Sequence, residues 1–467
     1  MAVRVPFVPT GICGQISALL VACGKGRCLT ENAYVPTTDF FDDLKWRGLI
    51  HQTTDDARIG GWLAEKPRTI YVGFDPTADS LHVGHFMGLV TLRRFQQAGH
   101  RPIALVGGAT GMIGDPSGKS AERNLLSKEQ LEANVAGMAA QMRRFLEFDR
   151  GASPALLVNN FDWTAPWSYL AFLRDIGKNF PVNVMLTKDS VKSRLGRGDD
   201  GDASAGMSYT EFSYMLLQAY DFVHLYDTYG CELQAGGSDQ WGNITAGIDL
   251  GRRMRGAQLH GITWPLLTKS DGTKMGKTEG GAVWLAAERT SPYAFYQYWI
   301  NVNDDDAGTC LRRLTDLARD EINDLDAARA ADPAKRVSQR RLAENLTQLV
   351  HGDAGLATAQ RATEIFFGAE VSQLSDAELT QIFADVQSKR LPRAMLDAGL
   401  PILDALCEAG LAASKGEARR TVSQGGAYVN NRRVNDLEYK LTAADLASET
   451  VVVLRSGKKK YALLRFV

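Results

Sequence analysis

A strand, a helix and a second strand follow one another within about forty residues, and this pattern limits the fold more than any other feature of the chain. Residues 69–74 form a short apolar run, residues 84–97 have helical periodicity, and residues 102–106 form a second apolar run. Two buried strands joined by a helix make a parallel βαβ unit. The pattern therefore predicts an α/β fold with a doubly wound parallel sheet of the Rossmann-like type.

The hydrophobic periodicity changes along the chain, and this change predicts its domains. Further strands are expected at 155–159 and 224–227, with helices from residue 38, at 209–220 and at 241–254. Helices dominate after residue 285, at 292–300, 336–351 and 356–367, and residues 389–392 are expected to be a linker. Two short helices and strands at 450–454 and 461–466 follow. We therefore expect an N-terminal extension (1–37), an α/β domain (38–284), an α-helical domain (285–390) and a small α+β module (399–467).

Composition narrows the class of protein. With 467 residues the chain is too long for one core, and 45% hydrophobic residues can supply several. No uninterrupted apolar run approaches the ~20 residues that cross a bilayer. The six cysteines form no CxxC pair, which is typical of reduced thiols. These features predict a cytoplasmic protein without a membrane partner.

The first 37 residues differ from the remainder. Arg4, Lys25 and Arg27 are basic, and no acidic residue precedes Glu31. Either a targeting peptide or an upstream start codon would produce such a leader, although it has no clear small-residue cleavage site. We expect this extension to be disordered.

His82-Val-Gly84-His85 stands where the first strand has ended and the helix begins. Backbone N–H groups and the helix dipole attract anions at such a position. Two imidazoles three residues apart share a helical face and can both donate hydrogen bonds to phosphate oxygens. Gly84 has no side chain, so a nucleotide can approach the backbone. The motif indicates an ATP site, although a structural histidine pair would have the same sequence.

A second motif lies about 190 residues downstream. Lys274-Met-Gly-Lys277-Thr278 follows a loop-like stretch, and its two ammonium groups and hydroxyl suit a pyrophosphate leaving group. A solvated basic turn is the alternative if the motif is taken alone. Gly114–Ser120 looks like a phosphate-binding P-loop, but its glycines are separated by three residues where that motif needs four. A P-loop ATPase is therefore disfavoured.

Together the two motifs resemble the HIGH and KMSKS signatures of class I aminoacyl-tRNA synthetases. The resemblance to bacterial-type tyrosyl-tRNA synthetases is closer still, and it runs from about residue 39 to the C-terminus. Four stretches carry it: 71–82 (YVGFDPTADSLH), 107–119 (GGATGMIGDPSGK), 214–221 (YMLLQAYD) and 236–243 (GGSDQWGN).

This resemblance implies a role for each matched residue. Tyr71 and Asp221 would bind the phenol of tyrosine. The remaining tyrosine-binding residues would be Asp115, Tyr214 and Gln218 at the α-ammonium group and Gln240 at the carboxylate. The ATP-binding residues would be Asp75, Thr77, His82, Gly84, His85, Gly237, Asp239, Lys274 and Lys277. The catalytic residues around the phosphates would be His82, His85, Lys119, Arg123, Lys274, Lys277 and Thr278. No protein-bound metal site is expected, and ATP would act with Mg²⁺.

Residue spacing supports the tyrosine pocket independently of the resemblance. Tyr214, Gln218 and Asp221 are spaced i, i+4 and i+7, so they share one face of a helix. Apolar neighbours such as Met215 and Phe222 argue against a purely solvated polar face. One departure is Val72, where relatives often carry a cysteine that contacts the ribose.

The C-terminal module has 11 basic and 7 acidic residues, a local charge of +4 in a chain of net charge −1. A basic surface suits phosphate contact, although a solvated charged face is the alternative. The sequence around 414–431 resembles the RNA-binding module of ribosomal protein S-four type. The resemblance implies tRNA-binding residues in this module, namely Lys415, Arg419, Arg420, Arg432 and Arg433. It also implies an anticodon-binding role for the helical domain.

These features predict a homodimeric ligase that activates L-tyrosine with ATP and transfers it to the 3′ end of tRNA(Tyr). The alternatives are a tryptophanyl-tRNA synthetase, which normally lacks such a tail, and a non-catalytic RNA-binding or splicing protein derived from a synthetase. An HxGH adenylyltransferase would have neither the KMGKT motif nor the RNA module.

Overall fold

The computed structural model describes residues 39–117, 126–188, 191–192, 207–278, 281–371, 374–384, 386–458 and 460–467. The N-terminal extension, Lys119 and Arg123 lie outside these ranges, as does the side chain of Thr278. No helix among the described residues is long and apolar enough to span a membrane.

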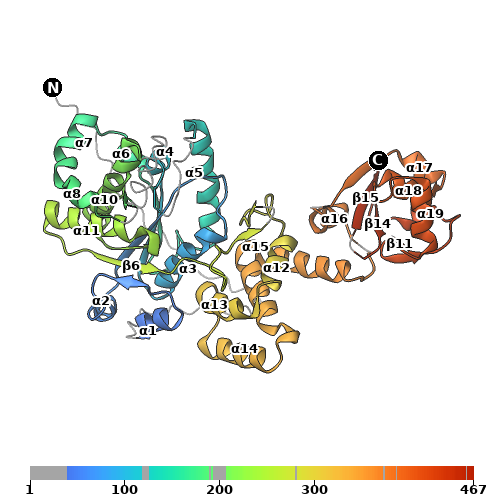
Figure 1. The fold of residues 1–467 in the computed structure, drawn as a ribbon, viewed down its shortest axis with the longest axis horizontal. Helices are drawn as coiled ribbons and strands as arrows, with labels where there is room; N and C mark the ends of the chain where they lie inside the picture. The colour runs from blue at the N-terminus through green and yellow to red at the C-terminus, as the bar shows by residue number, and fades with distance from the viewer. Residues whose placement is uncertain are drawn as a thin grey trace, which may run out of the picture. The chain divides into compact units, whose positions relative to one another are not determined.

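A mixed sheet forms the centre of the first part of the chain (Figure 1). The described residues place six strands in the order β1-β6-β5-β2-β3-β4. All neighbours are parallel except β1 and β6. The strands are β1 (Gln52–Thr53), β2 (Thr69–Phe74), β3 (Arg101–Val106), β4 (Leu156–Asn159), β5 (Cys231–Gly237) and β6 (His260–Trp264). The order reverses between β2 and β5, and open α/β sheets bind ligands outside the carboxyl ends of strands at such a point.

Successive side chains of each strand point to opposite faces of this sheet, and apolar residues on both faces pack against helices. Val72 and Ala104 join the core that contains α3 (Val83–Gln97). Tyr71 and Ile103 join the opposite core with α10 (Tyr209–Tyr229). The other helices are α1 (Asp39–Trp46), α2 (Ile59–Glu65), α4 (Thr110–Ile113), α5 (Lys128–Met142), α6 (Phe161–Thr164), α7 (Tyr169–Asp175), α8 (Val182–Met185) and α11 (Trp241–Arg255). The expected doubly wound fold is confirmed.

The strand predicted at 224–227 is wrong, because these residues continue α10 to Tyr229. Gly230, with a φ of 62°, ends the helix in the left-handed conformation, and the strand β5 begins at the next residue. A short apolar run does not distinguish a strand from a buried helical turn, which explains the error.

The next segment is helical as expected, with α12 (Pro292–Ile300), α13 (Asp304–Leu314), α14 (Arg319–Ala331) and α15 (Val337–Phe366). The two helices predicted at 336–351 and 356–367 correspond to α15, which is interrupted at Gly352 (φ 73°).

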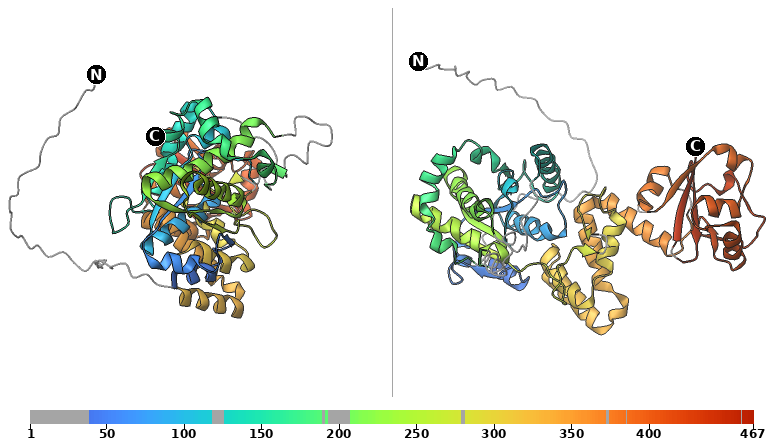
Figure 2. Two further views of the ribbon diagram at one scale, coloured as in Figure 1. Left: turned by 90° about the vertical axis from the view of Figure 1, so that its left-hand side faces the viewer. Right: turned by 45° about the horizontal axis from the view of Figure 1, so that its top comes forward.

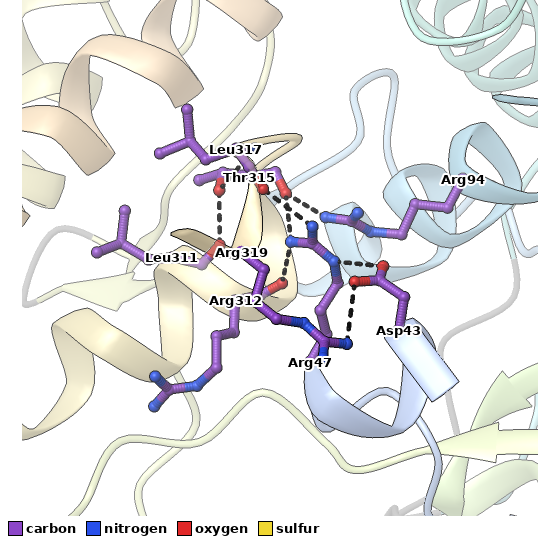
Figure 3. Close-up of polar contacts among 8 residues, drawn as sticks. All are labelled: Asp43, Arg47, Arg94, Leu311, Arg312, Thr315, Leu317 and Arg319. Carbon is purple, nitrogen blue, oxygen red and sulfur yellow. Dashed lines mark hydrogen bonds and ion pairs between the residues drawn. The ribbon is translucent and has the colours of Figure 1, made fainter. Parts of the chain in front are cut away.

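Two arginines attach α13 to the sheet domain (Figure 3). Arg47, which follows α1, donates hydrogen bonds to the carbonyls of Arg312 (3.2 Å), Thr315 (3.3 Å) and Leu317 (2.9 Å). Arg94 of α3 donates to the Thr315 carbonyl as well. Guanidinium groups at the carboxyl end of a helix satisfy its last carbonyls and complement its dipole. These contacts fix the end of α13.

The C-terminal part contains a five-stranded sheet in the order β12-β11-β14-β15-β9 among the described residues. Figures 1 and 2 show helices packed beside it. Its strands are β9 (Ser388–Leu391), β11 (Ala427–Val429), β12 (Arg432–Val434), β14 (Val451–Ser456) and β15 (Lys460–Phe466). The short strands β10 (Leu400–Pro401) and β13 (Lys440–Leu441) pair beside helices α16 (Asp376–Ile382), α17 (Arg393–Asp397), α18 (Ile402–Glu408) and α19 (Lys415–Ser423).

The linker predicted at 389–392 is wrong over most of its length. Residues 388–391 form β9, which pairs in parallel with β15. Three residues of β9 are polar and exposed, so the segment resembles a linker in sequence, and only its pairing with a distant strand makes it part of a sheet.

Candidate active site

A cavity of about 380 Å³ opens at the carboxyl ends of β2 and β5. Every predicted tyrosine-binding and ATP-binding residue lines it: Tyr71, Asp75, Thr77, His82, Gly84, His85, Asp115, Tyr214, Gln218, Asp221, Gly237, Asp239, Gln240, Lys274 and Lys277. Segments that are far apart in sequence therefore meet at the point where the strand order reverses. Lys119, Arg123 and the Thr278 side chain lie outside the described part of the chain, so their placement stays a prediction.

Asp221 and Tyr71 lie deep in this cavity, with exposed fractions of 2% and 1%. The carboxylate of Asp221 accepts hydrogen bonds from Asn160 Nδ2 (3.0 Å) and Trp163 Nε1 (2.8 Å). Burial raises the pKa of Asp221 to about 7, although both donors favour the ionised form. The Tyr71 hydroxyl is buried and has no hydrogen-bond partner among the described residues. Burial and the nearby Asp221 raise the pKa of this phenol, so it stays neutral.

A network of polar side chains forms another wall of the cavity. Tyr214 donates from its hydroxyl to Asp75 (2.9 Å), and burial beside Asp75 raises the pKa of Tyr214. Gln240 donates to Asp115 (2.7 Å), and the Gln218 amide donates to Gln240 (3.3 Å). Carboxylate and amide oxygens that converge in this way suit an ammonium group. The i, i+4, i+7 pattern on α10 therefore faces the cavity as the spacing predicted.

The two histidines of the HVGH motif cap helix α3. His82 Nδ1 accepts from Gly84 N (3.0 Å), and His85 Nδ1 accepts from His82 N (3.3 Å). Their rings stack with centroids 3.9 Å apart. Because Nδ1 is the acceptor in both neutral rings, the proton stands on Nε2, which is then a donor. A Cβ at Gly84 would lie 2.7 Å from the His82 ring, so this close packing requires glycine.

Lys274 and Lys277 are exposed residues at the mouth of the cavity. Asp239 faces the same space, and its pKa is raised by burial and by Asp115, while Lys274 acts in the opposite direction. A cluster of acids near two lysines gives the cavity oppositely charged regions. Such an arrangement can hold a substrate that carries both an ammonium group and phosphates.

Several polar residues of the site were not singled out by sequence. Asn160 and Trp163 hold Asp221, Thr110 donates to Asp75 (2.8 Å), and Asn243 donates to Gln218 (3.0 Å). Thr110 and Asn243 carried a signal, since they lie in the stretches 107–119 and 236–243, whereas Asn160 and Trp163 carried none. Val72 lines the cavity and has no polar side-chain atom, so its side chain supplies no hydrogen bond to a ribose.

The sheet, the HVGH helix start and the KMGKT loop around one cavity define a class I aminoacyl-tRNA synthetase, and comparison with known proteins agrees. Residues 63–368 match the family model for class I tRNA synthetases (W and Y). Residues 378–464 match the tyrosine–tRNA ligase SYY-like C-terminal domain. The chain belongs to the tyrosine–tRNA ligase family.

Individual relatives support this assignment. A tyrosine–tRNA ligase of Rhodopirellula baltica is 61% identical over 440 residues, covering 94% of this chain and 98% of that one. One from Roseiflexus castenholzii is 51% identical over 92% of this chain and all of its own length. A C-terminally truncated mitochondrial tyrosyl-tRNA synthetase of Aspergillus nidulans has a similar structure. Its TM-score is 0.62 at 32% identity, over 70% of this chain and 93% of that one.

Proposed function

We propose that this chain activates L-tyrosine with ATP to tyrosyl-AMP and pyrophosphate, and then transfers tyrosine to the 3′ end of tRNA(Tyr). One observation carries this proposal: a single cavity holds the buried pair Tyr71 and Asp221 as well as the HVGH and KMGKT motifs. The pair suits a phenol, which donates to Asp221 and accepts from Tyr71. Tryptophan has only an N–H donor at its ring, so it would leave the Tyr71 hydroxyl without an acceptor.

The first step needs no nucleophile from the protein. A carboxylate oxygen of tyrosine attacks the α-phosphorus of ATP, the bond from that phosphorus to the bridging oxygen breaks, and pyrophosphate leaves. The protein contributes position and charge. His82, His85, Lys274 and Lys277 supply donors at the phosphates, and we assign Lys119, Arg123 and Thr278 to the same group from the sequence resemblance. In the second step a terminal ribose hydroxyl of the tRNA attacks the carbonyl carbon, and AMP leaves.

Mg²⁺ enters this scheme as part of the nucleotide substrate. Among the described residues, no group of three or more His, Cys, Asp or Glu side chains could hold a metal ion. Mg²⁺ commonly binds through substrate phosphates and water with one or two carboxylates, and it does not need a dedicated cage of protein ligands. We therefore propose that ATP carries the ion into the cavity.

Pyrophosphate exchange tests the proposed activity. Purified full-length protein should incorporate labelled pyrophosphate into ATP when tyrosine is present. Tryptophan or phenylalanine in place of tyrosine should support little exchange, because each leaves a buried polar group of the Tyr71–Asp221 pair unpaired. Equal exchange with phenylalanine, or none with tyrosine, would contradict the proposal.

The C-terminal module is proposed to bind tRNA, and α19 offers the clearest surface for it. Arg419 and Arg420 are exposed, and no ion pair involves either of them within the described residues. The other predicted tRNA-binding residues already have partners within the protein. Lys415 pairs with Asp404 (2.5 Å), Arg432 contacts Glu370, and Arg433 donates to the Gly425 carbonyl (2.7 Å). We accordingly expect Arg419 and Arg420 to contribute most to binding.

Replacing both Arg419 and Arg420 by alanine should raise the Kd for tRNA(Tyr) by about 10-fold at low salt and flatten its dependence on salt, because fewer counterions are released. Tyrosine-dependent exchange should not change. Filter binding over a range of salt concentrations measures both the Kd for tRNA(Tyr) and its dependence on salt. The control removes two adjacent exposed arginines that share an acidic neighbour, Arg252 (2.6 Å from Asp249) and Arg253 (2.7 Å from Asp249). If both double variants bind tRNA as the parent does, α19 is not a tRNA contact.

We further propose a cytoplasmic homodimer in which residues 285–390 bind the anticodon. Support for the dimer comes from large apolar side chains that stay exposed on and beside α7 and α8, including Tyr169 (64%), Leu170 (76%) and Val182 (57%). Apolar groups gathered on a surface mark interaction sites more often than scattered ones do.

A further inference from the structure

Residues of helices α12 and α13, which belong to neither sequence motif, contact the KMGKT loop and hold it in place. Residues 267–278 form a tight turn. Met275 N donates to the Leu267 carbonyl (2.9 Å), and Lys269 N donates to the Thr273 carbonyl (2.8 Å). These short-range bonds shape the turn, but they do not fix its position above the cavity. Contacts with α12, α13 and α3 do so.

Gly276 lies at the centre of these contacts. Its N–H donates to the hydroxyl of Tyr298 on α12 (2.7 Å). Its carbonyl accepts from Val283 N (2.8 Å), and the Val283 carbonyl accepts from Val83 N (3.0 Å) at the start of α3. A continuous chain of hydrogen bonds therefore joins α12, the KMGKT loop and the HVGH helix.

Packing leaves little room for the loop to shift at this point. Gly276 has a φ of 83°, and a Cβ there would lie 2.7 Å from the Cβ of Val83. Burial raises the pKa of the Tyr298 hydroxyl to about 12, so it stays neutral and can accept the hydrogen bond from Gly276. Removing this one oxygen would leave the Gly276 N–H without its partner.

Two further contacts anchor the same loop on α13. Ser270 N donates to the carboxylate of Asp306 (2.7 Å), which is buried in the first turn of that helix. Met275 is 5% exposed, and its sulfur lies 3.5 Å from the sulfur of Cys310. Lys274 and Lys277 flank the buried residues Met275 and Gly276, and both lysines are exposed.

We infer that Tyr298 is a positioning residue that, together with Asp306, holds the KMGKT loop so that Lys274 and Lys277 face the cavity. Charged donors stabilise a transition state most when they are fixed in advance, because no reorganisation is then needed. The catalytic part of this inference rests on the proposed function. The structural part, that Tyr298 holds the loop, does not.

The test compares two variants on one helix. Tyr298→Phe removes the hydroxyl that contacts Gly276. Tyr296→Phe makes the same chemical change at a residue of α12 that lines no part of the cavity. Full-length proteins are compared well below their unfolding temperatures. Tyr298→Phe should lower kcat for tyrosine-dependent exchange by about 10-fold and change the Kd for tyrosine by less than about 2-fold. Tyr296→Phe should match the parent in both values.

Limited trypsin digestion measures the loop directly, without any activity. Cleavage after Lys274 and Lys277, identified by mass spectrometry, should become several-fold faster in Tyr298→Phe and stay unchanged in Tyr296→Phe. Asp306→Asn, which weakens the contact to Ser270, should act in the same direction to a smaller extent.

Different outcomes separate the two proposals. A parent protein without tyrosine-dependent exchange would contradict the proposed function, and trypsin would still report on Tyr298. An active parent with parental kcat and cleavage rates in Tyr298→Phe would overturn the inference. Faster cleavage at an unchanged kcat would overturn its catalytic part.

Discussion

Replacing Asp221 by asparagine should weaken tyrosine binding by roughly 100-fold, which is about 3 kcal/mol. The carboxylate already accepts from Asn160 Nδ2 on one oxygen and from Trp163 Nε1 on the other. An asparagine must direct its NH₂ group toward one of these two donors. The substitution is similar in shape, but it places a donor against a donor in a buried site and removes the charge that receives the phenol.

The pKa of Asp221 adds a dependence on pH. Burial raises this pKa to about 7, so the carboxylate is mostly ionised at pH 8 and mostly protonated at pH 6. An ionised carboxylate accepts a stronger, charge-assisted hydrogen bond from the phenol than a neutral carboxyl does. Tyrosine affinity in the parent should therefore fall by up to about tenfold from pH 8 to pH 6. In Asp221→Asn this dependence should disappear.

Equilibrium binding of tyrosine, followed by protein fluorescence at several pH values, measures both effects. Asp227→Asn is the matched control, since Asp227 lies on the same helix, is exposed and pairs with Arg255 (2.7 Å). It should bind tyrosine as the parent does. Parental affinity in Asp221→Asn would show that Asp221 does not receive the phenol.

The surroundings of Asp221 also show what could be predicted from sequence. Tyr214, Gln218 and Asp221 were predicted to share a face because a helix repeats every 3.6 residues, and all three line the cavity. Asn160 and Trp163 follow β4, some 60 residues earlier, and have no periodic relation to α10. Their contact with Asp221 exists only because β3 pairs with β4 and thereby brings the end of β4 beside the cavity.

Contacts with distant parts of the chain also explain the two errors in secondary structure. The polar segment 388–391 becomes a strand because β15 offers it a parallel partner. Residues 224–227 stay helical because α10 packs along its length against the sheet and α11, and its end is set by Gly230. Local sequence predicted β2, β3, β4 and α3 correctly, but it did not identify β5 or β6 of the same sheet, and tertiary context decided the two errors.

The lysines of the KMGKT loop should dominate the rate of activation. Lys274→Ala and Lys277→Ala should each lower kcat for tyrosine-dependent exchange by about 100-fold or more, the cost typical of removing one preorganised donor from a developing charge. Both side chains lie at the mouth of the cavity, away from the buried Tyr71 and Asp221, so the Kd for tyrosine should change by less than about 2-fold. A loss in kcat at unchanged tyrosine affinity identifies an interaction made with the phosphates in the transition state.

Lys269→Ala provides the control, because it removes the same charge from the same turn at a residue that does not line the cavity. It should retain kcat within about 2-fold. If all three alanine variants lost activity equally, the effect would come from the net charge of the loop, and specific contact by Lys274 and Lys277 would be disproved. In a double variant with Lys274→Ala and Tyr298→Phe, the loss in kcat, expressed as a free energy, should be smaller than the sum of the two single losses. The reason is that Tyr298 acts only through the lysines that it positions.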